Sequence, residues 1–241
     1  MITQETLVQA ATIGQTTEIN VAREYCQHLF LGAFYQQKGS ERVMFKGGTA
    51  LKIVHGSPRF SEDLDFSGFG VSVHQIESWV LDSLQKIELG AIKVDMQESK
   101  TTSGGYFGAL EYRLCDYVLF IQIEVSLRQR NDVQGQGVLI TPELLPAYML
   151  TLLPASRLVE EKIAALLTRQ KPRDFFDLYF MLRKGLITAE MKPHLATIRD
   201  MLQNITLDFK SELSQFLPKS YLGVLRDFRS VLSNELRRHG V

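Results

Sequence analysis

The chain has 241 residues, of which 45% are hydrophobic and 22% are charged, and its formal net charge at pH 7 is zero. This composition is that of an ordinary globular protein, and it contains no run of 18 or more apolar residues that would form a membrane span. The two cysteines, Cys26 and Cys115, argue against a disulfide scaffold. The N-terminus also lacks a secretory signal, so we expect a protein of the reducing cytoplasm, with one large domain or two small ones.

The charge is distributed unevenly along the chain. Residues 1–125 carry 10 Lys and Arg against 15 Asp and Glu, whereas residues 126–241 carry 17 against 12. An acidic N-terminal half suits the binding of a metal ion, and a mildly basic C-terminal half favours contact with phosphate groups. The excess is small, so this pattern favours a nucleic-acid partner without identifying one.

Helices and short strands are predicted to alternate through the first half, because apolar residues recur there with helical and then with strand periodicity. The clearest strand covers 118–127, where Ile121 and Ile123 lie on one face and Gln122 and Glu124 on the other. We expect a short helix or arm at 5–17, helices at 18–37, 49–55 and 73–89, and strands at 43–45, 64–67, 92–98, 106–114 and 118–127.

The last third of the chain is predicted to be helical. A polar loop is expected at 128–137, and Pro142, Pro146 and Pro154 interrupt the pattern near 142–156. We therefore predict a first domain at 1–150 and a second at 151–241. Helices of the second domain are expected at 156–170, 173–184, 188–203, 207–216 and 219–238.

The most informative stretch is a predicted strand that leads through Lys46 into Gly47-Gly48-Thr49 and then into a helix. Glycines just before a helix allow backbone N–H groups to approach a phosphate. This stretch therefore predicts a site for the phosphates of a nucleotide.

Two aspartates, Asp63 and Asp65, follow at the next predicted strand and are expected to point to one face. Neighbouring carboxylates repel each other unless a cation lies between them, and Mg²⁺ or Mn²⁺ prefers such oxygen ligands. Glu124, on the polar face of the clearest strand, is our candidate for a third carboxylate, and Glu111 is its rival. The alternative is that both aspartates only flank a turn, but the preceding Gly-Gly-Thr favours the metal site.

Two cations of the second domain, Lys162 and Arg169, are seven residues apart and therefore share one face of a predicted helix. From that face they can hold triphosphate oxygens, although an ordinary solvated face gives the same pattern. The next helix begins near Pro172 and carries Asp174 and Asp177 on one face. An acid in the first turn also balances the helix dipole, which is a structural explanation for Asp174.

Arg59 and Ser61 precede the two aspartates. Both residue types bind phosphate, but both also fix loops. The sequence leaves these two roles open.

Together these blocks resemble the AbiEii/AbiGii toxin family of the DNA polymerase β-like nucleotidyltransferase superfamily. The matching blocks are residues 45–51, 59–66, 161–169 and 173–179, which occur in the family's order. Each block alone is a weak pattern, whereas four in the right order are fairly specific. The resemblance spans about residues 45–180, and the terminal regions match only in being helical.

The resemblance implies an α+β fold, in which a minimal nucleotidyltransferase domain with a mixed β-sheet and flanking helices is followed by an α-helical domain that completes the active-site cleft. It implies a metal-dependent toxin that transfers a nucleoside monophosphate from an NTP to an acceptor, expected to be an RNA such as the 3′ end of a tRNA. It also implies a separate antitoxin protein as a partner.

Carried onto this chain, the resemblance assigns roles residue by residue. The catalytic residues would be Asp63, Asp65, Glu124, Lys162 and Asp174, of which Asp63, Asp65 and Glu124 would hold Mg²⁺ or Mn²⁺. The nucleotide-binding residues would be Lys46, Gly47, Gly48, Thr49, Arg59, Ser61, Lys162, Arg169 and Asp177. The third carboxylate is a glutamate where the superfamily more often has aspartate.

A second hypothesis is a non-catalytic module that binds an NTP or RNA and acts by sequestration or by contact with a partner. In that case the acidic pair would be structural or would bind nucleotide without turnover. A metal-dependent nuclease also uses clustered acids, but the glycine turn between a strand and a helix favours triphosphate binding.

Overall fold

The computed structural model describes residues 2–129 and 133–241. These residues form two compact units. The described residues of the first fall within Met1–Gly56 and Phe60–Pro154, and the second comprises Ser57–Arg59 and Ala155–Val241. The segment Ser57–Arg59 therefore belongs to the second unit although the chain on both sides belongs to the first. The sequence did not lead us to expect this exchange.

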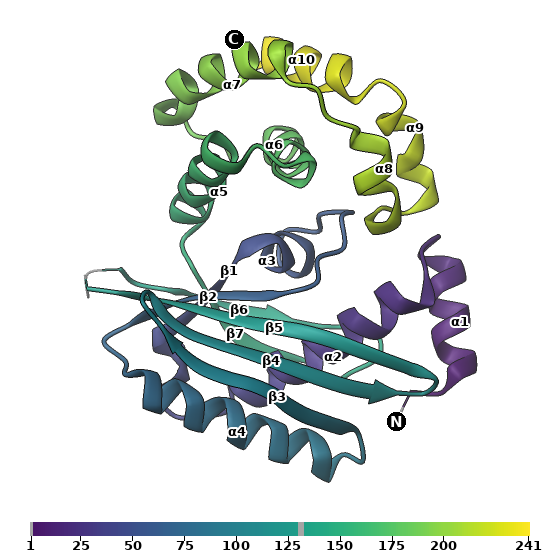
Figure 1. Cartoon of the computed structure of the whole chain (residues 1–241), viewed down its shortest axis with the longest axis vertical. Helices are drawn as coiled ribbons and strands as arrows, with labels where there is room; N and C mark the ends of the chain where they lie inside the picture. The colour runs from purple at the N-terminus through teal and green to yellow at the C-terminus, as the bar shows by residue number, and fades with distance from the viewer. Residues whose placement is uncertain (1, 130–132) are drawn as a thin grey trace. The chain divides into compact units, whose positions relative to one another are not determined.

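The first unit is built on a mixed sheet (Figure 1). Within the described residues the sheet has seven strands in the order β3-β4-β5-β2-β1-β7-β6. The strands are β1 (Val43–Lys46), β2 (Leu64–Phe69), β3 (Lys93–Thr102), β4 (Gly105–Leu114), β5 (Tyr117–Arg128), β6 (Gln136–Ile140) and β7 (Tyr148–Leu152). Neighbouring strands are antiparallel except that β2 pairs with β5, and β1 with β7, in parallel. The mixed sheet that we predicted is thereby confirmed.

Helices of the first unit are α1 (Gln4–Ile13), α2 (Glu18–Phe34), α3 (Gly47–Ile53) and α4 (Val73–Leu89). Both long helices begin at a capping residue: the Thr17 side chain accepts a hydrogen bond from a backbone N–H of α2, and Ser72 forms a capping box with Gln75 of α4. Helices α2 and α4 lie along one face of the sheet (Figure 1).

The core of the first unit lies between this sheet face and the two helices. Phe34 of α2 packs against Phe66 of β2 and Trp79 of α4, and Phe45 of β1 packs against Phe66. Since side chains of a strand alternate between faces, the residues between these aromatic positions point to the other face. We call that opposite face, which carries Asp65, the carboxylate face.

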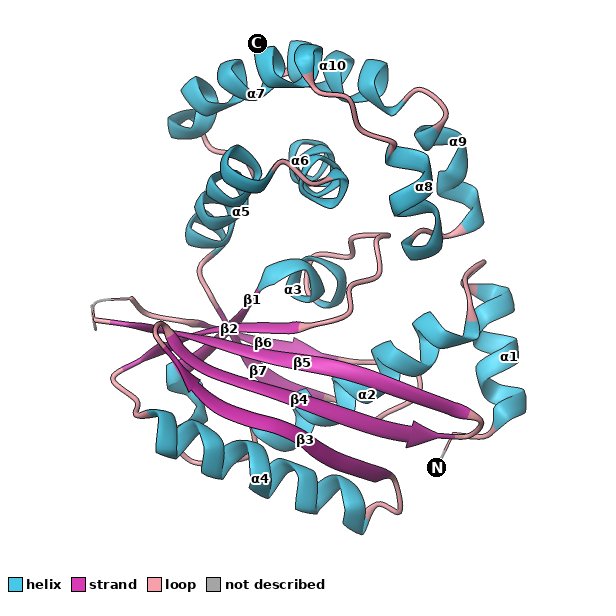
Figure 2. Cartoon of the chain, viewed as in Figure 1, coloured by secondary structure: helices cyan, strands magenta, loops and turns pink. Residues whose placement is uncertain are grey.

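The second unit is helical among its described residues (Figure 2). Helix α6 packs against α5, α8 and α10. Phe175 and Phe176 of α6 meet Phe209 and Phe228 in an aromatic core. The helices are α5 (Ala155–Arg169), α6 (Pro172–Lys184), α7 (Lys192–Asn204), α8 (Phe209–Leu213), α9 (Leu222–Leu225) and α10 (Phe228–Arg238).

Several sequence-based boundaries are wrong, each for a physical reason. The helix predicted at 219–238 is two helices, because the Asp227 side chain caps a new start by accepting from the N–H of Ser230. The predicted loop 128–137 overlaps β6, and β7 lies where we expected only a boundary. Both strands are short and paired by distant segments, so local periodicity does not reveal them. Residues 130–132 of that predicted loop lie outside the described part of the chain.

The helix predicted at 18–37 ends at Phe34. Where the structure describes the chain, none of its helices combines the length and the apolar character that crossing a bilayer requires.

Candidate functional site

Asp65 and Glu124 are brought side by side by the pairing of β2 with β5. These two strands run parallel in a register that makes Asp65 and Glu124 direct neighbours, so their Cα atoms are about 5 Å apart. Both side chains lie on the carboxylate face, because Leu64, Phe66 and Ile123 occupy the covered face. Glu111 of β4 instead pairs with Phe120 and binds Arg113. Glu124 is therefore the glutamate beside Asp65.

Neither carboxylate of this pair is neutralised within the described residues. Asp65 is half-buried and Glu124 is exposed, and the described chain gives neither side chain a hydrogen bond or an ion pair. Two adjacent unpaired carboxylates repel each other, which makes them suited to a cation. Their oxygens are the donors that Mg²⁺ or Mn²⁺ prefers, so this pair fits such an ion.

Asp63 differs from the sequence-based prediction. It precedes β2, which begins at Leu64, so it is not part of an alternating strand face. Its backbone carbonyl accepts a hydrogen bond of 2.5 Å from the hydroxyl of Thr49, which is fully buried. Within residues 2–129 and 133–241 no three His, Cys, Asp or Glu side chains are grouped closely enough to hold a metal ion. The structure thus brings together two of the three predicted carboxylates.

The turn between β1 and α3 is fitted to the Asp65 side chain. Gly47 has a φ of +84°, which favours glycine. A Cβ atom at this position would lie 2.0 Å from Asp65 Oδ2. Lys46, the last residue of β1, lies directly across from Asp65 in the antiparallel pair. The predicted phosphate turn and the predicted metal ligand are therefore immediate neighbours.

A buried amide of α2 holds the segment before the aspartates. Gln27 Nε2 donates to the carbonyls of Ser61 and Glu62, at 2.9 and 3.0 Å. Gln27 is only 2% exposed, and its role was not predicted. The one available signal was a polar residue on an apolar helix face. This contact makes the Ser61 backbone part of the scaffold.

In the second unit, Arg59, Lys162 and Asp177 form one buried cluster, which we call the Asp177 cluster. Arg59 donates through Nε to Asp177 Oδ1 at 2.8 Å and through Nη2 to Oδ2 at 3.0 Å. Lys162 Nζ donates to Oδ2 at 2.7 Å. Asp177 is 1% exposed, and the side chains of Arg59 and Lys162 are 5% and 11% exposed.

The two cations decide the ionisation of Asp177. Burial by itself would raise the pKa of this carboxyl, but the charges and hydrogen bonds of Arg59 and Lys162 lower the pKa to about 2. Asp177 is therefore charged at any physiological pH. Of the two roles left open for Arg59, the structure shows the one that fixes its segment.

Arg169 and Asp174 form a second pair in the same unit. Arg169 Nη2 lies 2.6 Å from Asp174 Oδ1, and Arg169 Nε lies 2.9 Å from Oδ2. The Asp174 carboxylate also accepts from the backbone N–H of Lys171 at the start of α6. The structural explanation for Asp174 as an acid of the first turn therefore agrees with the geometry. Lys162 and Arg169 both reach α6 from the single face of α5 that their spacing predicted.

Comparison with known proteins gives a family and a fold. The family model described as "Nucleotidyl transferase AbiEii toxin, Type IV TA system" matches residues 29–232. No match was found among curated protein sequences.

Two solved structures from Helicobacter pylori share the fold. The structure of JHP933 is 17% identical with a TM-score of 0.60, and the similarity covers 93% of this chain and 96% of that one. A second structure, assigned to the nucleotidyltransferases, is 18% identical with a TM-score of 0.60, and the similarity covers 92% of this chain and 98% of that one. The predicted α+β fold is thereby confirmed.

Proposed function

Because the chain belongs to the AbiEii family of nucleotidyltransferase toxins of type IV toxin–antitoxin systems, we propose that it transfers a nucleoside monophosphate from an NTP to a hydroxyl group of an RNA, such as the 3′ end of a tRNA. The observation that carries this proposal is the unpaired pair Asp65 and Glu124, held in register beside the Gly47 turn. A nucleoside triphosphate and its metal ion supply the opposite charges that this pair lacks.

In this reaction the acceptor oxygen attacks the α-phosphorus, and the bond to the leaving pyrophosphate breaks. Glu124 takes the proton of the attacking hydroxyl, while Asp65 and Glu124 also offer oxygens to Mg²⁺ or Mn²⁺. Such an ion, when bound, offsets the negative charge that develops on the phosphate oxygens. Asp63 is the candidate for an additional ligand. The backbone N–H groups around Gly48 and the Lys46 side chain contact the triphosphate.

Lys162 of the helical unit contributes a phosphate contact. Its ammonium group has three donors, of which one is directed to Asp177. We assign Asp174 and Asp177 to positioning roles, because their carboxylates are occupied by Arg169, Arg59 and Lys162. An activity that draws on nucleoside triphosphates and RNA belongs in the cytoplasm, and a toxin of this class needs a cognate antitoxin protein.

The test is transfer from each α-labelled NTP to total cellular RNA with Mg²⁺ or Mn²⁺, followed by a gel. A labelled RNA band is expected for the wild type. Asp65→Asn and Glu124→Gln should lower its intensity by about 10²–10⁴, the usual contribution of a catalytic acid or base. Glu111→Gln is the matched control, because Glu111 lies on the adjacent strand β4 and already binds Arg113. Full activity of Glu124→Gln would exclude the proposed role of Glu124.

A second candidate is a module that binds NTP or RNA without turnover. It is favoured by the finding that no three potential metal-binding side chains gather within the described residues. Calorimetry with each NTP, with and without Mg²⁺, separates the two candidates when it is combined with an assay for pyrophosphate. Binding without pyrophosphate release on any RNA would support the module.

A further inference from the structure

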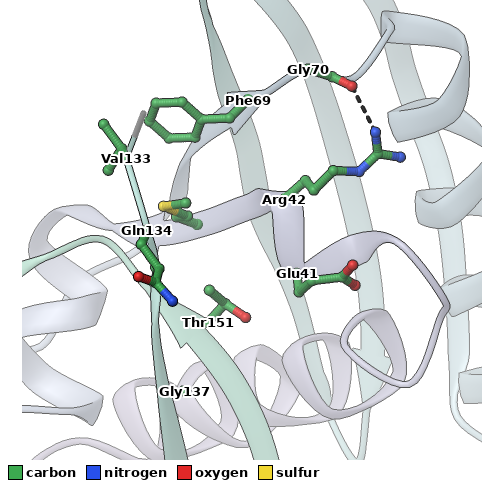
Figure 3. Close-up of a pocket in the computed structure, with 10 residues that line it drawn as sticks. Glu41, Arg42, Phe69, Gly70, Val133, Gln134, Gly137 and Thr151 are labelled. Carbon is green, nitrogen blue, oxygen red and sulfur yellow. Dashed lines mark hydrogen bonds between the residues drawn. The ribbon is translucent and has the colours of Figure 1, made fainter. Parts of the chain in front are cut away.

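A concave site separate from the Asp65–Glu124 pair lies on the carboxylate face, at the opposite end of β2 from the glycine turn. It is a cavity of about 490 Å³ bounded by the start of β1, the end of β2 and the segment that leads into β6. All of its lining residues belong to the first unit. Figure 3 shows Phe69 and Val133 close together on one side, with Arg42 bonded to the carbonyl of Gly70.

The floor of the cavity is apolar and firmly packed. Met44 and Phe69 are buried, and Val133 packs against them. The segment at Gly135 approaches the sheet so closely that a Cβ atom there would lie 2.3 Å from the Thr151 methyl group and 3.2 Å from Met44. This wall is therefore set by packing against the sheet.

The remaining walls offer hydrogen-bonding groups. Neither the Gln134 amide nor the Thr151 hydroxyl has a hydrogen-bonding partner within the part of the chain that the structure describes. At the rim, Glu41 accepts from the N–H of Gly39 at 2.9 Å, and Arg42 donates to the Gly70 carbonyl at 2.8 Å. These bonds hold the two charged groups in place while other donors and acceptors on them stay available.

An apolar floor with polar groups at its sides matches the chemistry of a nucleobase. A base has two apolar faces and an edge of hydrogen-bond donors and acceptors, and an amide such as that of Gln134 can pair with such an edge. We propose that this cavity binds a nucleobase of the acceptor strand, one or two nucleotides before its reacting 3′ end. The assignment rests on the proposed function.

The position of the cavity favours the acceptor over the donor nucleotide. Phe69 lies four residues beyond Asp65 on the same face of β2, which is about 13 Å along the strand. That distance is longer than the single sugar by which the α-phosphate of a nucleotide is joined to its own base. A strand of more than one nucleotide spans it.

The test measures binding of 5′-labelled octaribonucleotides of A, C, G and U by fluorescence anisotropy. Gln134→Ala removes the amide. Gly137→Val adds bulk to the cavity wall at a strand position where a Cβ atom makes only an ordinary 3.6 Å contact with Met149. Each variant should bind the preferred octamer five- to tenfold more weakly and should lose the preference among bases. The control Gln85→Ala, at an exposed position of α4, should change neither.

Three further measurements complete the test. Thermal melting verifies that both variants fold, and calorimetry with NTP alone should give unchanged affinity. An equal loss of NTP affinity would assign the cavity to the donor, and unchanged octamer binding, or none by the wild type, would also overturn the proposal. Asp65→Asn should bind the octamer normally while losing transfer. A wild type that binds octamers selectively but transfers no nucleotide would refute the proposed function. The assignment of the cavity to a nucleobase would then still stand.

Discussion

The carboxylate pair of the sheet unit and the Asp177 cluster of the helical unit differ in whether cations of the chain pair with their acidic side chains. Asp65 and Glu124 lie side by side without partners among the described residues. Asp177 is buried and held by three hydrogen bonds from Arg59 and Lys162. A carboxylate whose charge is already matched inside the protein stabilises the fold, whereas one left unmatched is available to a ligand. The comparison therefore separates carboxylates that remain open to a ligand from carboxylates that cations of the chain already hold.

The largest expected effect is on stability, at Asp177. Asp177→Asn would leave Arg59 and Lys162 as buried cations beside a neutral amide, so we expect a loss of about 3–5 kcal/mol in unfolding free energy. The measurement is urea denaturation of the whole chain, monitored by circular dichroism. Asp200→Asn is the matched control, because the Arg199–Asp200 pair in the same unit is exposed, and it should change stability by less than about 1 kcal/mol. Equal effects of both variants would remove the distinction between the two regions.

Lowering the pH should destabilise the two units in different pH ranges. Burial, and to a smaller extent the charge of Lys52, lowers the pKa of His28 in α2 to about 4. An unfolded histidine has a pKa near 6.5 and therefore binds a proton before the folded one does. The unfolding free energy of the first unit should fall by about 3 kcal/mol as the pH falls from about 6.5 to 4. Asp177 has a pKa lowered to about 2, so its contribution to the second unit is present above about pH 4 and is lost between about pH 4 and 2.

The single tryptophan of the chain, Trp79 of α4, makes this difference measurable. Acid titration in a fixed urea concentration should change Trp79 fluorescence at a higher pH than it changes the helical circular dichroism. His28→Gln should shift the fluorescence transition to lower pH. Coincident transitions in both proteins would contradict the assignment to His28.

Alanine substitutions at two glycines with similar backbone angles distinguish a clash with Asp65 from the strain of a left-handed backbone. Gly47 and Gly56 have φ of +84° and +77°, but only Gly47 has the Asp65 carboxylate where a Cβ would lie. Gly56→Ala should cost about 1–2 kcal/mol, the penalty for a left-handed residue. Gly47→Ala should cost more and should also abolish NTP transfer, measured by the gel assay. If Gly56→Ala abolished transfer equally, the close fit of the turn to Asp65 would be irrelevant.

The smallest effect on stability is expected at Glu124. Glu124→Gln removes one of two adjacent like charges, so it should stabilise the first unit by about 0.2–1 kcal/mol. The melting temperature of the wild type should rise with added Mn²⁺, since a ligand that binds the folded state stabilises it. That rise should disappear in Glu124→Gln. A variant that is less stable than the wild type, or that still responds to Mn²⁺, would show that Glu124 is not an unpaired ligand.

Elements with a long, regular pattern were predictable. The helix Val73–Leu89 has the predicted bounds, and β5 differs from its prediction by one residue at each end. In both cases the apolar positions alone define the buried face. Helix α9 and strands β6 and β7 are short, so their existence depends on what they pack or pair with.

By itself, the sequence determined which residue types stand together in the motifs: Gly47 before a helix, Asp65 at the start of a strand, and Glu124 on a polar strand face. Such features are local, because they follow from backbone freedom and from the alternation of side chains. Only the tertiary structure decided which charges stay unmatched. The pairing of β2 with β5 joins Asp65 to Glu124, and Arg59 meets Asp177 across 118 positions of the chain. Contacts over such separations depend on the packing of the whole unit, so the local spacing of residues in the sequence does not predict them.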